Sequence, residues 1–114
     1  MTDNEILEAA ASTYAKGYRP ITDEWSYTDS KGCCFLAAAC LEVNQEIIDG
    51  EEDDASAIAA SILGTSEDFV EGAISGFDDW SLNPTKNDEY GRGYSLGVLA
   101  REKFLPKMTD TRMD

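Results

Sequence analysis

The sequence predicts a mainly α-helical fold, a compact bundle of four to five helices with a short strand or hairpin near residues 18–30. An α+β arrangement stays open. Two observations predict this class. The 114-residue chain is 42% hydrophobic, which is enough for one buried core. Apolar residues recur at helical spacing in most segments, which predicts helices. The exception lies around Pro20, where Trp25 and Tyr27 alternate with polar residues as they would in a strand.

Two helices are expected in the first half of the chain, over residues 3–16 and about 33–48. Thr2 and Glu5 have the spacing of a capping box, in which each side chain satisfies a free backbone N–H of the first turn. Gly17 suits the left-handed conformation that ends many helices.

Three further helices are expected in the second half. The apolar positions of 55–63 predict one helix, and the acidic residue at 53 or 54 would be its N-cap. A helix N-terminus favours such negative charge. Thr65 or Ser66 would cap the next helix, and the last helix would run over about residues 89–105.

One globular domain is expected over residues 1–106, followed by a frayed tail at 107–114. We find no stretch of about 18 apolar residues that would cross a membrane. Three cysteines are an odd count, which is more typical of a reduced, cytoplasmic protein than of a disulfide framework. A cytoplasmic location is therefore expected.

Charge is the most informative property of the sequence. The chain has 23 acidic residues, 9 basic residues and no histidine, a formal net charge of −14. From Gly32 to Thr85 there are twelve acidic residues and no Lys or Arg, whereas residues 90–114 hold five basic residues against three acidic ones. A negative surface repels nucleic acids and anionic membranes, so neither is expected as a direct partner.

The acidic interval predicts a face that binds a basic surface on a host protein. Residues 42, 46 and 49 follow one face of a predicted helix, and acidic residues continue at 51–54. Such carboxylates can replace phosphates in a basic groove, as they do in inhibitors that mimic DNA. The predicted partner-binding residues are Glu42, Glu46, Asp49, Glu51, Glu52, Asp53 and Asp54.

Two other functions are considered. The alternative to an interaction protein is a small structural or accessory domain whose acidity serves only solubility. An enzyme that uses Cys33 or Cys34 is least favoured, because no histidine is present to activate the thiol. No catalytic residue, cofactor or metal is therefore predicted, and the oligomeric state stays open.

The cysteines of the segment KGCCFLAAACLEV are predicted to be core residues, since free cysteine behaves as a small buried hydrophobe. Cys33 and Cys40 would share one helix face, whereas Cys34 would point about 100° away, which disfavours a zinc site. A reactive Cys33 is the alternative, because a helix N-terminus lowers the pKa of a thiol.

Two glycine pairs, Gly72 with Gly76 and Gly93 with Gly97, predict close backbone contact between the last two helices. Each glycine costs up to about 1 kcal/mol of helix stability relative to alanine, so its presence needs a packing reason. A phosphate-binding loop is disfavoured because the segment GRGYSLG follows no predicted strand.

Three segments together resemble a family of small phage and bacterial proteins. They are GCCFLAAACL, DFVEGAISGFDD and YGRGYSLGVLARE, and the resemblance covers about residues 17–104. The sequence departs from the family pattern at Leu36 and Ala37, where a glycine is expected. The resemblance implies a phage-derived protein without an established activity, and it transfers no catalytic residue.

Overall fold

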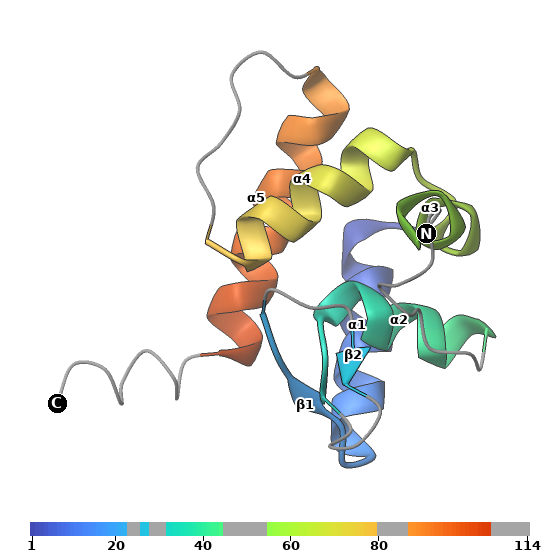
Figure 1. Ribbon diagram of the computed structural model, residues 1–114, viewed down its shortest axis with the longest axis vertical. Coiled ribbons are helices and arrows are strands. Elements are labelled where there is room, and N and C mark those ends of the chain that lie inside the picture. The colour runs from blue at the N-terminus through green and yellow to red at the C-terminus, as the bar shows by residue number, and fades with distance from the viewer. Residues whose placement is uncertain (23–25, 28–31, 45–54, 80–86, 106–114) are drawn as a thin grey trace, which may run out of the picture.

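The computed structural model describes residues 1–22, 26–27, 32–44, 55–79 and 87–105, which form five helices and three short strands (Figure 1). The helices are α1 (Asp3–Ala15), α2 (Phe35–Asn44), α3 (Ala55–Leu63), α4 (Glu67–Phe77) and α5 (Asp88–Phe104). The strands are β1 (Arg19–Pro20), β2 (Ser26–Tyr27) and β3 (Gly32–Cys33). The predicted mainly helical fold is thus confirmed. In the parts of the chain described here, no helix has the length and apolar character that crossing a membrane requires.

The predicted start and end signals of α1 are present. Glu5 N donates to Thr2 Oγ1 at 3.2 Å and Thr2 N donates to Glu5 Oε1 at 2.8 Å, which together form the capping box. Gly17, two residues beyond the helix, has a φ of 109°, a conformation that costs a glycine little. The chain can therefore turn directly from α1 into β1.

Side chains also cap the N-termini of α4 and α5. Ser66 Oγ accepts the Phe69 N–H at 3.2 Å, which selects Ser66 over Thr65 as the cap of α4. Asn87 Oδ1 accepts the Tyr90 N–H at 3.0 Å. The last helix therefore begins at Asp88, one residue before its predicted start, because an asparagine immediately precedes it.

The sheet has the strand order β1-β3-β2, with β3 parallel to β1 and antiparallel to β2. The strands near residues 18–30 were predicted, but β3 was not. The helix was expected to begin near Cys33 or Cys34. A start at Cys33 was wrong because Gly32 and Cys33 both pair with two neighbouring strands. Cys33 and Cys40 consequently do not share a helix face.

Helix α2 lies at the centre of the core. Six consecutive side chains, from Phe35 to Cys40, are buried, and α1, α3 and α4 all contact this helix. The buried Thr13 hydroxyl of α1 donates to the Ala38 carbonyl at 2.7 Å, so close packing of the two helices leaves this polar group satisfied. The predicted continuation of α2 to residue 48, the predicted cap at 53 or 54 and the tail at 107–114 lie outside the described residues.

Helices α4 and α5 cross in the same chain direction with their backbones in contact, as the glycines predicted (Figure 1). A Cβ atom added at Gly72 would meet Tyr90 and Tyr94, and one added at Gly76 would meet Tyr94 and Val98. Residue numbers on both helices therefore rise together along the contact, which makes the pair parallel.

The contact is reciprocal. A Cβ atom at Gly93 would meet Phe69 and Ala73, and one at Gly97 would meet Ala73 and Phe77. At each of the four glycines, an added Cβ atom would lie less than 3.0 Å from a backbone atom of the facing helix. Real Cβ atoms essentially never show so short a separation. No residue larger than glycine fits without moving a helix.

We expect Gly97→Ala to lower the free energy of unfolding by about 1–3 kcal/mol, the usual range for overpacking a core. The reason is that the added methyl group meets backbone atoms of Ala73 and Phe77, which cannot rotate away as a side chain can. Urea or thermal unfolding of the purified variant measures the change.

Gly91→Ala is the matched control, because Gly91 lies in the same helix and nothing would lie within 4 Å of its added Cβ atom. Alanine there should stabilise the protein by up to about 1 kcal/mol through helix propensity. Equal stabilities for the Gly91 and Gly97 variants would contradict the close contact.

Candidate functional site

The predicted acidic face is described at one of its seven residues, Glu42 on α2. Its Oε1 atom accepts from Lys16 Nζ at 2.7 Å and from Ser12 Oγ at 3.0 Å, and these bonds lower the pKa of Glu42 in that order of size. Because Lys16 and Ser12 belong to α1 and its C-terminal end, Glu42 fastens α2 to α1. The other six predicted residues lie outside the described part of the chain.

Acidic residues also occupy the first turns of three helices. The helix dipole places partial positive charge at each N-terminus, so carboxylates there stabilise their own helix. The first turns of α1, α4 and α5 each hold two acidic residues, which are Asp3, Glu5, Glu67, Asp68, Asp88 and Glu89. Part of the negative charge of this protein therefore supports the fold.

The three cysteines are free thiols in the core, as predicted. Cys33 and Cys40 have no exposed surface and Cys34 is 6% exposed. Burial raises the pKa of each thiol to about 12, and the Ala37 N–H that points at Cys34 Sγ only partly offsets this for Cys34. The lowered pKa considered for Cys33 is absent, because this residue is buried in a strand.

Metal ligands do not gather in the described residues, where no group of three or more His, Cys, Asp or Glu side chains could hold an ion. The Tyr14 hydroxyl next to the cysteines donates to the Cys33 carbonyl at 2.8 Å. This bond joins α1 to β3 and gives the tyrosine a structural role.

The folded protein should resist iodoacetamide at pH 8, because the reactive species is the thiolate and burial disfavours it. Mass spectrometry should find no label on Cys33, Cys34 or Cys40 in the native state and three labels after unfolding in guanidinium. Rapid labelling of one cysteine in the native protein would overturn the core assignment.

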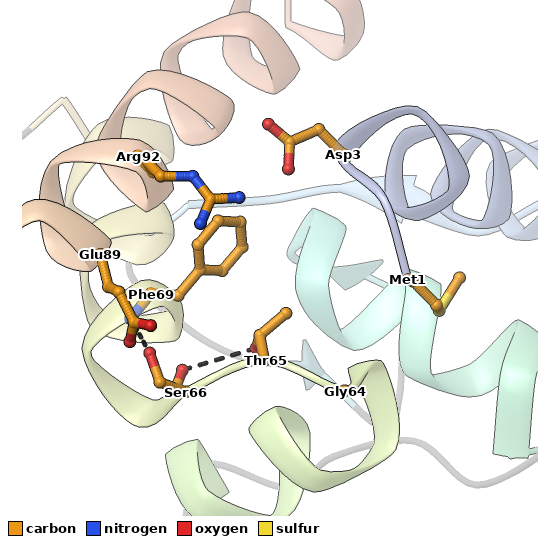
Figure 2. Close-up of a pocket in the computed structure, with 8 residues that line it drawn as sticks. All are labelled: Met1, Asp3, Gly64, Thr65, Ser66, Phe69, Glu89 and Arg92. Carbon is orange, nitrogen blue, oxygen red and sulfur yellow. Dashed lines mark hydrogen bonds between the residues drawn. The ribbon is translucent and has the colours of Figure 1, made fainter.

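A pocket of about 370 Å³ lies where the N-terminal ends of α1, α4 and α5 meet (Figure 2). The parallel pairing of α4 and α5 brings two of these ends together, and Asn87 Nδ2 donates to Asp68 Oδ2 across them at 2.6 Å. The turn between α3 and α4 closes one side. Gly64 in this turn has a φ of 69°, and the Met1 ammonium nearby donates to the Leu63 carbonyl at 2.9 Å.

The pocket combines charged side chains of both signs with an aromatic ring. The Arg92 guanidinium lies over the Phe69 ring, 5.6 Å from its centroid, and Figure 2 shows the Asp3 carboxylate across from it. Glu89 lines the side of the pocket opposite Asp3, near Ser66. Sequence analysis did not identify these residues as a group, since they come from three helices and no local motif joins them.

No protein family, curated protein or solved structure matches the chain. The resemblance to small phage and bacterial proteins therefore stays a prediction.

Proposed function

We propose that the protein is a non-enzymatic acidic interaction protein that binds a basic surface on a host protein, in the manner of a nucleic-acid mimic. The observation that carries the proposal is the segregation of charge along the chain. Twelve acidic residues and no basic residue occur between Gly32 and Thr85. A surface without interspersed cations presents a continuous negative potential to a basic partner.

The packing of α4 supports this proposal. Its apolar and small residues face α5 and the core, whereas Glu67 and Glu71 are exposed, as is Asp79 just beyond the helix. Two cations from outside the interval are engaged by their own chain. Lys16 pairs with Glu42, and Arg101 Nη1 donates to the Phe77 carbonyl at 2.9 Å.

The second candidate, an accessory domain whose acidity serves solubility and stability, is favoured by a different observation. Six acidic residues lie in the first turns of helices, where the helix dipole explains them without any partner. The two candidates differ in what they predict for acidic residues other than these six and other than the predicted cap at 53 or 54, such as Glu51 and Glu52.

We expect Glu51→Lys with Glu52→Lys to weaken binding to the basic partner by about tenfold, mainly through slower association. The partner would be captured from host lysate on the immobilised wild-type protein and purified. Its association and dissociation rates would then be measured at about 50 and about 500 mM salt, where screening separates charge-driven from apolar binding. Duplex DNA should compete for the same partner.

The matched control is Glu8→Lys with Glu102→Lys, which makes the same charge change at two exposed positions outside the interval. Its affinity should stay within about twofold of the wild type if the binding face is local. Affinity that is independent of salt, or equal losses in both double variants, would reject the mimicry proposal. A change in solubility alone would favour the accessory domain.

A further inference from the structure

The pocket between α1, α4 and α5 holds three charged side chains that do not pair with one another. Among the described residues, the Arg92 guanidinium contacts the Phe69 ring, and no ion pair or hydrogen bond links it to Asp3 or Glu89. Opposite charges around one cavity of about 370 Å³ are thus held apart instead of neutralising each other. A ligand with charges of both signs would complete both sets of contacts.

We propose that this pocket binds a free α-amino acid. Arg92 would take the ligand carboxylate, because a guanidinium matches a carboxylate with two parallel hydrogen bonds. The Asp3 carboxylate, which lies across from Arg92, would take the ammonium group, and Glu89 would add negative potential from the other side of the pocket. The volume suits a ligand of this size at the small end of known sites. This inference goes beyond the proposed interaction with a protein and does not depend on it.

Charge balance favours a zwitterion over an ion of either sign. A simple anion would be attracted by Arg92 and by the Met1 ammonium but repelled by two carboxylates and by a chain of net charge −14. A simple cation would meet Arg92, which the Phe69 ring holds inside the pocket (Figure 2). A molecule with both groups can pair with the positive and with the negative groups of the pocket at the same time.

The fold positions these charged groups and the Phe69 ring through three helices, α1, α4 and α5. Phe69 is 3% exposed and packs in the core at the first turn of α4, so it is a fixed support for the guanidinium. Glu89 and Arg92 lie three residues apart on α5, which places them on neighbouring turns of one face. The capping box at Thr2 fixes the start of α1 and with it Asp3.

The test is a titration of the ¹⁵N-labelled full chain with each of the common α-amino acids, at constant pH and ionic strength, up to about 10 mM. At least one amino acid should cause saturable shifts at the amides of Thr65, Phe69 and Arg92. Its N-acetyl derivative lacks the ammonium group and its amide lacks the carboxylate, and both should bind at least about tenfold more weakly.

Arg92→Gln should weaken the binding of the same amino acid by at least about tenfold. The affinity of Arg92→Lys should lie between that of Arg92→Gln and that of the wild type. Lys103→Gln is the matched control, since Lys103 lies on the same helix over the Phe104 ring, outside the pocket. Glu89→Gln should also weaken binding, whereas Asp88→Asn removes a charge from the same helix turn without touching the pocket. Thermal melts confirm that each variant is folded.

The proposal is overturned if no amino acid gives saturable shifts, or if the blocked derivatives bind as tightly as the parent. It is also overturned if folded Arg92→Gln retains wild-type affinity. Loss of this binding would leave the interaction with a basic protein partner untouched, because that interaction is tested at residues 51 and 52.

Discussion

The structure depends on direct backbone contact between α4 and α5. Four glycines remove the side chains that would otherwise separate the two helices, and each faces backbone atoms of the other helix. The contact makes the pair parallel, so both N-termini lie at one end and the Asn87–Asp68 hydrogen bond closes that end. At the other end, Arg101 of α5 donates to the Phe77 carbonyl of α4. The pocket exists because this geometry places Phe69 and Arg92 side by side.

The rest of the core joins this helix pair to α1 and α2 through a few large side chains. Phe35 of α2 packs against Phe77 of α4 with ring centroids 5.0 Å apart, and Tyr14 of α1 meets Phe104 of α5 at 4.9 Å. Most other buried positions of α2 are alanine or cysteine, so the helices approach closely. The cysteines belong to this set of small residues, which explains their presence without any chemistry.

Local signals in the sequence predicted the helices and their caps well. Thr2, Ser66 and Gly17 act within a few residues of where they stand, so their spacing is enough to place helix ends. The glycine pairs predicted a contact between helices because nothing local justifies glycine inside a helix. Such signals lie within a few residues of one another or along one face of a single helix, so the sequence alone shows them.

Features that need distant residues were missed. Strand β3 is two residues long and exists through pairing with β1 and β2, so apolar spacing alone extended the following helix over it. The ion pair between Glu42 and Lys16, 26 residues away, was not predicted either. The pocket unites Asp3, Phe69 and Arg92, whose proximity follows only from the parallel pairing of α4 and α5.

The most direct test of the parallel backbone contact is a nuclear Overhauser measurement on the labelled protein. A Cβ atom at Gly72 would lie 2.9 Å from Tyr94 N, and one at Gly93 would lie 3.0 Å from Ala73 N. Cross-peaks are therefore expected from a Gly72 Hα to the Tyr94 amide and from a Gly93 Hα to the Ala73 amide. Their absence, when contacts within α4 and within α5 are observed, would contradict the account, as would cross-peaks that pair Gly72 with Gly97.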